Sequence, residues 1–173
     1  MERNVARVGK ISFGAFPRSG SHFFVYLTDC NWLDHRMKPL KTEPNVAVSI
    51  RNPADCIASW INLCNDKRPD RVKKTIDWYC DYYLECKTLN VPIIWFDQLI
   101  NDPETCIRFV DQAHDLKTTI KPRWDLATNF HYPTVDKTKI EVLKTEVQNS
   151  PDFIKAQTIY ESLAVACPKA ANV

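Results

Sequence analysis

The sequence has very little glycine and no long apolar run. Only three of its 173 residues are glycine, at positions 9, 14 and 20. With so few glycines, one that interrupts a strand–helix pattern marks a place where a side chain would block a turn or a ligand. No stretch reaches the roughly 20 apolar residues of a membrane-spanning helix. The N-terminal MERNVARVGK also lacks the apolar run of a signal peptide. We therefore expect a cytoplasmic protein that does not enter a membrane.

The chain also lacks the cysteine and histidine spacings of metal sites. Its seven cysteines include no C-x-x-C pair, and its four histidines are scattered at 22, 35, 114 and 131. An odd number of cysteines without such pairs favours reduced thiols, and no metal site is predicted. Cys56, Cys64, Cys80 and Cys106 fall in apolar stretches, so we expect these thiols to be buried.

An excess of charge of one sign is absent as well. The net charge is +2, with 45% hydrophobic and 25% charged residues, as in ordinary globular proteins. Any anion site must therefore be local. Trp60, Trp78 and Trp95 fall in core patterns with no basic stripe between them, which argues against a nucleic-acid partner. The length predicts one domain over residues 1–173.

One stretch, residues 10–32, combines a strand, a tight loop and a helix. Residues 10–16 suit a buried strand, PRSGS breaks the pattern, and apolar residues then recur at helical spacing as far as Trp32. Such a loop directs backbone N–H groups toward phosphate or sulfate at the positive end of a helix. Arg18 adds a forked cation, while Ser19 and Ser21 add hydroxyls. The stretch predicts an anion site that includes Gly20.

The loop is not the Walker A motif of nucleotide kinases and NTPases. That motif is G-x-x-x-x-G-K-[ST]. Here Gly14 and Gly20 are six residues apart rather than five, and no lysine follows Gly20. A P-loop kinase is therefore disfavoured.

Two more apolar runs, at residues 45–50 and 91–96, predict further buried strands. Helical patterns follow from 53 to 64, 71 to 89 and 103 to 114, with Asn52 and Asp102 as N-caps, and two helices close the chain. Residues 33–44 and 116–135 are expected to be irregular. This alternation predicts an α/β, three-layer αβα fold with a mostly parallel central sheet. Ligands bind at the carboxyl ends of the strands in such sheets.

A second anion site is predicted after the second strand. Arg51 ends that strand, and Ser59 follows eight residues later. Two helical turns separate them, so the Ser59 hydroxyl can face back toward the strand end. Together they would bind a second phosphate at some distance from the first loop. The alternative is that Arg51 pairs with a carboxylate and that Ser59 is only a small packing residue.

PRSGS after one strand and RNPADCIAS after the next resemble the sulfotransferase family, in its phage or bacterial and carbohydrate or tyrosyl-protein forms. WFDQLINDPETCIRFV, residues 95–110, looks like the third strand and following helix of that family. The resemblance implies a P-loop NTPase-like fold and the co-substrate 3′-phosphoadenosine 5′-phosphosulfate (PAPS). It also implies that Arg18, Ser19, Gly20 and Ser21 hold the 5′-phosphosulfate, and that Arg51 and Ser59 hold the 3′-phosphate.

The chain departs from that family in three ways. His22 stands where the family often has Thr or Ser, so one hydroxyl contact is lost while the backbone N–H remains, and the His22 side chain is an alternative contact to the sulfonate. The interval between the motifs is short, and acceptor-binding elements usually fill it. No R-K-G segment lies near the C-terminus, where Lys137 or Lys139 is a substitute for the 3′-phosphate contact.

Family members take their general base from the interval between the motifs, where His35 lies. A histidine titrates near neutral pH, which suits a general base, so His35 is favoured over Glu43 and Asp34. The expected reaction moves a sulfuryl group from PAPS to a hydroxyl or amine of a small-molecule or carbohydrate acceptor. Arg18 would stabilise the departing phosphate. The alternative is a catalytically silent nucleotide- or anion-binding module. The acceptor and the oligomeric state are not specified by the sequence.

Overall fold

A parallel sheet forms the centre of the protein. The computed structural model describes residues 11–28, 30–33, 35–116, 122–127 and 136–164. Its sheet has four strands in the order β2-β1-β3-β4, and every neighbouring pair is parallel. The strands are β1 (Ser12–Ala15), β2 (Asn31–Trp32), β3 (Val46–Ile50) and β4 (Ile93–Trp95). The predicted α/β class and parallel sheet are confirmed.

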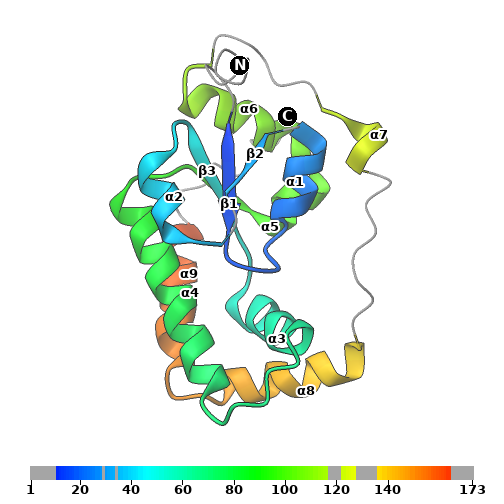
Figure 1. Cartoon of the computed structure of the whole chain (residues 1–173), viewed down its shortest axis with the longest axis vertical. Coiled ribbons are helices and arrows are strands. Elements are labelled where there is room, and N and C mark those ends of the chain that lie inside the picture. The colour runs from blue at the N-terminus through cyan, green and yellow to red at the C-terminus, as the bar shows by residue number, and fades with distance from the viewer. Residues whose placement is uncertain (1–10, 29, 34, 117–121, 128–135, 165–173) are drawn as a thin grey trace, which may run out of the picture.

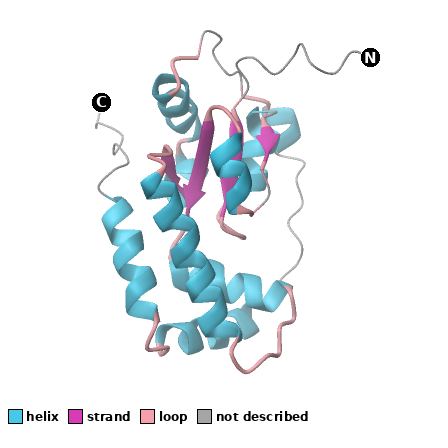
Figure 2. Cartoon of the chain, turned by 60° about the vertical axis from the view of Figure 1, so that its left-hand side comes forward, coloured by secondary structure: helices cyan, strands magenta, loops and turns pink. Residues whose placement is uncertain are grey.

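Both faces of the sheet are covered, because successive side chains of a strand point to opposite faces. In β3, Val46, Val48 and Ile50 join one hydrophobic core, while Ala47 joins the other. All five residues of this strand are buried. Figure 2 shows helices on both sides of the strands. The layers are therefore helix, sheet and helix.

The helices divide between these two cores. One core contains residues from α2 (Met37–Thr42), α4 (Arg71–Thr88) and α9 (Phe153–Ala164), and the other contains residues from α1 (Ser21–Thr28), α5 (Phe96–Asn101) and α6 (Pro103–Ala113). Helices α3 (Pro53–Leu63) and α8 (Lys137–Gln148) pack together beyond the carboxyl ends of the strands (Figure 1). The short α7 (Trp124–Ala127) lies beside α1.

The predicted helix starts at α3 and α6 are confirmed by their caps. The Asn52 side chain accepts hydrogen bonds from the backbone N–H groups of Ala54 and Asp55, at 3.0 and 3.4 Å. The Asp102 carboxylate accepts one from Thr105 N–H at 3.2 Å. In both helices a proline follows the cap, where its missing N–H costs no hydrogen bond. The start of α3 fixes where Arg51 leaves the sheet.

Three predicted boundaries are wrong. The first helix ends at Thr28, and Trp32 belongs to β2, which pairs with β1 at the sheet edge. The interval 33–44 contains α2, where Pro39 occupies the first helical turn and so removes no intrahelical hydrogen bond. The strand predicted at residues 91–96 ends at Trp95, and Phe96 begins α5. Of the interval 116–135, residues 117–121 and 128–135 lie outside the described part.

The expectation for the thiols is confirmed at Cys56, Cys80 and Cys106, which are buried, and is wrong at Cys64, which is exposed after α3 ends. Burial raises the pKa of Cys56 to about 12, so this thiol stays protonated at neutral pH. In the last helix, α9, Ile154 is 70% exposed although it is apolar. Within the described residues, no helix combines the length and apolar character needed to cross a bilayer.

Candidate anion-binding site

The strand order creates a crevice at the carboxyl ends of β1 and β3. From β1 the chain crosses to β2 on one side, and from β2 it returns to β3 on the other side of β1. The connections that leave β1 and β3 therefore run apart, which is the position where open α/β sheets bind their ligands. The PRSGS loop leaves β1 here, and Arg51 leaves β3. The topology alone thus brings the two predicted motifs together.

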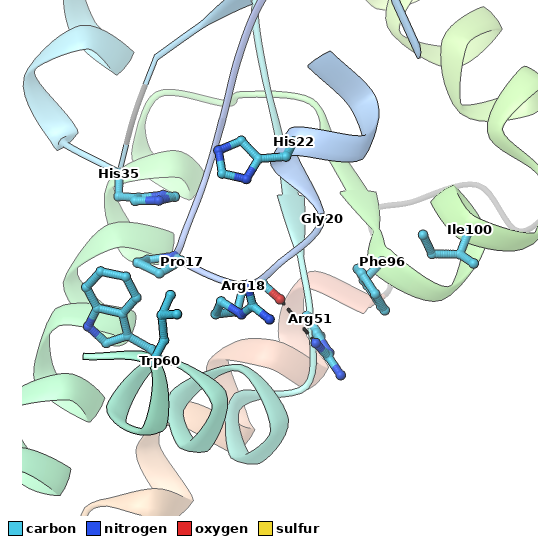
Figure 3. A pocket seen from close by; sticks show the side chains of 10 residues that line it. Pro17, Arg18, Gly20, His22, His35, Arg51, Trp60, Phe96 and Ile100 are labelled. Atoms are coloured by element: carbon cyan, nitrogen blue, oxygen red, sulfur yellow. Dashed lines mark hydrogen bonds between the residues drawn. The ribbon is translucent and has the colours of Figure 1, made fainter. Parts of the chain in front are cut away.

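A pocket of about 280 Å³ opens at this crevice. Figure 3 shows the arginine and histidine side chains gathered around it. Residues that follow each of the four strands line its wall, together with two residues of α3, and the described lining residues include no carboxylate. They are Pro17, Arg18, Gly20, His22, His35, Arg51, Trp60, Leu63, Phe96 and Ile100. Two arginines and two histidines without an acidic neighbour suit an anion.

Arg18 occupies a strained position at the tip of the loop. Ser19 N–H donates to Phe16 O at 3.2 Å, which closes a turn with Pro17 and Arg18 at its centre. Arg18 has φ of 67°, as the third residue of a type II turn requires, although glycine is the usual residue there. The Arg18 side chain is fixed as well, because its Nε donates to Ser59 Oγ at 2.9 Å. Such strain is typical of functional sites.

Arg51 is held against the same loop. Its Nη1 donates to the Arg18 carbonyl at 3.2 Å, and its guanidinium carbon lies 4.5 Å from the centre of the Phe96 ring. The Tyr79 hydroxyl donates to Arg51 O at 3.0 Å and so fixes its backbone. Ser59 bonds to Arg18 and not to Arg51. The two predicted anion sites therefore form parts of one pocket.

Gly20 is required by both conformation and space. Its φ is 87°, and a Cβ at this position would lie 2.8 Å from Phe96 Cδ2. Its carbonyl accepts from Phe24 N–H at 3.3 Å at the start of α1. A side chain would thus push on the ring that supports Arg51. The loop can turn into α1 only with glycine here.

We expect Gly20→Ala to lower the free energy of unfolding by about 1–2 kcal/mol, because alanine disfavours a left-handed backbone. The melting temperature should fall by roughly 2–8 °C for a chain of this size. The added methyl also displaces the half-buried Phe96 ring. Gly20→Ala/Phe96→Leu should regain part of any packing loss but none of the backbone loss. Differential scanning calorimetry checks both values. An unchanged melting temperature for Gly20→Ala would contradict the assignment.

His35 is oriented by the backbone of β1. Its Nδ1 lies 2.7 Å from Ala15 O. Because a carbonyl oxygen can only accept, Nδ1 carries the proton in this contact, and Nε2 of the neutral ring is an acceptor. The ring lines the pocket (Figure 3). His35 is therefore in position to accept a proton from a bound molecule.

His22 also lines the pocket and lies at the start of α1. Its ring centre is 4.8 Å from that of Trp32, which in turn lies 5.9 Å from His35. Burial lowers the pKa of His22, and the nearby charges of His35 and Arg18 lower it further. The His22 ring is therefore neutral at pH 7. An anion bound between His22, His35 and Arg18 would offset the electrostatic repulsion that lowers the pKa of His22.

Of the remaining predicted residues, none that the structure describes lines the pocket with its side chain. The Ser19 hydroxyl is fully buried beside Cys56 and Tyr83, and the Ser19 carbonyl accepts from Ser49 Oγ at 2.5 Å. Ser21 begins α1, but its side chain lies outside the described part, as does the whole of Asp34. Glu43, Lys137 and Lys139 are not among the lining residues.

Sequence reasoning missed the apolar wall, which consists of Trp60, Leu63, Phe96 and Ile100. Phe96 directly follows β4, as Arg51 follows β3. Arg51 was predicted because ligands bind at the carboxyl ends of parallel strands, and the same rule applies to Phe96. Trp60 was assigned to the core and instead is half-buried at the pocket. Its position beside Ser59 was the available signal.

A comparison with models of protein families finds no match, and a search of curated proteins finds no significant one. The residues described include no group of three or more His, Cys, Asp or Glu side chains arranged to hold a metal ion. The case for a function therefore depends on the pocket itself.

Proposed function

We propose that this protein is a PAPS-dependent sulfotransferase with a P-loop NTPase-like fold. One observation carries the proposal: Arg18 and Arg51, from the ends of adjacent parallel strands, line a single pocket together with His35. Two cations suit a nucleotide with two separate acidic groups. A correctly oriented imidazole suits a reaction that removes a proton. The resemblance of PRSGS and RNPADCIAS to sulfotransferase motifs supports the same choice.

In this proposal the 5′-phosphosulfate lies against the β1–α1 loop. Arg18 binds it, together with the positive N-terminal end of the α1 helix dipole. The 3′-phosphate lies against Arg51. Apolar residues at the rim would contact the adenine: Phe96 lies under Arg51, while Leu63 and Ile100 are 43% and 44% exposed. The pocket encloses the charged part of the nucleotide and leaves the remainder on this rim.

The proposed reaction forms one bond to sulfur and breaks another. The acceptor oxygen or nitrogen attacks sulfur, and its proton passes to His35 Nε2. The bond between sulfur and the bridging phosphate oxygen breaks, and its electron pair leaves on adenosine 3′,5′-bisphosphate. Arg18 stabilises the charge that develops on this phosphate. Such transfer has a loose transition state, so positioning and cations provide most of the catalysis.

Thermal stabilisation by the product nucleotide tests the proposed site. At a concentration 100 times the dissociation constant, adenosine 3′,5′-bisphosphate should stabilise the protein by about 2.7 kcal/mol. That corresponds to a rise in melting temperature of roughly 5–10 °C. AMP, which lacks the 3′-phosphate, should give a smaller rise at equal concentration. A larger rise with ATP and magnesium would reject this proposal in favour of a kinase-like site.

A second candidate is a nucleotide- or anion-binding module without transfer activity. The pocket volume of about 280 Å³ favours the module, because it lies at the lower end of the roughly 300–1,000 Å³ common for ligand pockets. A transfer reaction must accommodate an acceptor in addition to the nucleotide. Incubation with radiolabelled PAPS and a panel of hydroxyl and amine acceptors separates the two candidates. Labelled product supports the sulfotransferase. Tight binding of the bisphosphate with no product from any acceptor supports the module.

A further inference from the structure

A second hollow of about 530 Å³ adjoins the candidate site. It lies between the end of α3 and the start of α4, and we call it the α3–α4 hollow. Trp60 lines both this hollow and the first pocket. A ligand that extends past Trp60 from the first pocket would therefore enter the second one.

Two tryptophans form the apolar wall of the α3–α4 hollow. The ring centres of Trp60 and Trp78 are 5.9 Å apart, with the rings at 70° to one another. Phe16 packs beneath Trp78 at 4.9 Å, and His35 lies 6.1 Å from Trp60 on the other side. Both indoles are half-buried and so keep a surface exposed. A corner of this kind suits a flat ring, which can contact one indole by its face and the other by its edge.

The polar side of the α3–α4 hollow is mostly cationic. Lys67, Arg68 and Lys74 line it against one carboxylate, Asp66. Arg68 Nη2 holds Asp66 at 2.6 Å, and this pairing lowers the pKa of Asp66 to about 2. Asp66 is therefore charged and already paired at neutral pH. Lys74 is paired as well, with Asp70 at 2.7 Å, so the excess positive charge presented to a ligand is that of Lys67.

We propose that the α3–α4 hollow makes this protein select acceptors that carry a negative charge. The reacting hydroxyl or amine lies beside His35, the ring of the acceptor packs on Trp60 and Trp78, and its acidic group faces Lys67 and Arg68. This inference rests on the proposed function, because it takes the first pocket as the transfer site. A ring with an acidic group occurs both in aryl acids and in uronic sugars, and both classes meet the same requirements.

Three phenols with a negative, a neutral and a positive substituent opposite the hydroxyl test the proposal. They are 4-hydroxyphenylacetate, its neutral amide, and 4-(2-trimethylammonioethyl)phenol. Methyl glucuronide and methyl glucoside form the matching sugar pair. We expect roughly fivefold tighter binding of an acid than of its neutral partner, the upper range for an exposed ion pair. Binding is followed by tryptophan fluorescence with adenosine 3′,5′-bisphosphate present, and KM is measured in parallel. The pair with the larger difference identifies the acceptor class.

Single substitutions should change this preference in opposite directions. Lys67→Gln should reduce it, Asp66→Asn should increase it, and Arg68→Gln should abolish it, because the Asp66 carboxylate then loses its partner and offsets the charge of Lys67. Lys87→Gln is the matched control, since Lys87 is an exposed residue near the far end of α4. Trp78→Ala should weaken binding of the acid and the amide alike, which separates ring contact from charge.

The result that overturns the inference differs from the result that overturns the proposed function. If the bisphosphate binds but acids and neutral partners bind equally, or neither binds, the α3–α4 hollow does not select anions. If the bisphosphate does not bind while acids still bind in preference, the hollow remains an anion-selective site and the sulfotransferase proposal fails.

Discussion

Replacing Arg51 with alanine should weaken the binding of adenosine 3′,5′-bisphosphate by roughly 10- to 100-fold. A hydrogen bond to a charged group contributes about 1.5–3 kcal/mol, and each 1.4 kcal/mol is a factor of ten in affinity. AMP lacks the 3′-phosphate, so its affinity should change far less. Isothermal titration calorimetry with both ligands measures the difference. Equal losses for both nucleotides would show that Arg51 does not recognise the 3′-phosphate.

Arg51 also supports the loop, which complicates a simple interpretation of that variant. Its Nη1 bonds to the Arg18 carbonyl, so its loss can also disturb the binding of the 5′-phosphosulfate. Arg51→Lys keeps the charge but loses the forked geometry and the flat contact with Phe96. We expect it to bind with intermediate affinity. Arg108→Ala is the matched control, because Arg108 is exposed on α6, does not line the pocket and bonds to Thr105 of its own helix. Its affinities should equal those of the wild type.

Much of the fold was predictable because local chemistry and tertiary structure agree. The apolar runs that became β3 and β4 are short and are bounded by residues that break a strand. Asn52 and Asp102 each precede a proline, and both are the N-caps of the predicted helices. In α4, Val72, Ile76 and Tyr83 recur at helical spacing and are all buried. In such places the spacing of apolar residues already specifies which face packs on the sheet.

The missed elements are those whose stability comes from contacts distant in sequence. Strand β2 has two residues, too few for any periodicity, and exists through its pairing with β1. Helix α2 contributes one buried residue, Leu40, and includes a proline. Helix α5 likewise buries only Leu99. In each case tertiary packing decides the conformation, and composition favours a loop.

The position of the candidate site could be predicted from the sequence, but the contacts between its residues could not. A strand followed by PRSGS, and another followed by Arg51, indicated the correct end of the sheet. The bond between Arg18 and Ser59 joins residues that are 41 positions apart and depends on where α3 crosses that end. The contact between Arg51 and Phe96 likewise needs β4 to lie next to β3. Strand order is not written in local spacing, so these contacts required the structure.

The largest effect on turnover is expected at His35. We expect His35→Asn to reduce kcat by about 100- to 10,000-fold, the range for loss of a general base. Asparagine can still donate its side-chain N–H to Ala15 O, which retains the contact that orients position 35. The affinity for adenosine 3′,5′-bisphosphate should stay within about threefold of wild type. Such a change in binding free energy is no larger than that from the loss of one ordinary hydrogen bond. Steady-state kinetics and calorimetry on the same preparation give both values.

Two further variants separate proton transfer from packing at this position. His35→Ala leaves a space beside Trp60, and imidazole added to the assay should restore part of the lost rate if the missing group is a base. Glu43→Gln is the matched control, because Glu43 lies in the same interval of sequence but not on the pocket wall. It should retain wild-type turnover. Wild-type turnover in His35→Asn, or a loss in Glu43→Gln comparable to that in His35→Ala, would remove His35 from the mechanism.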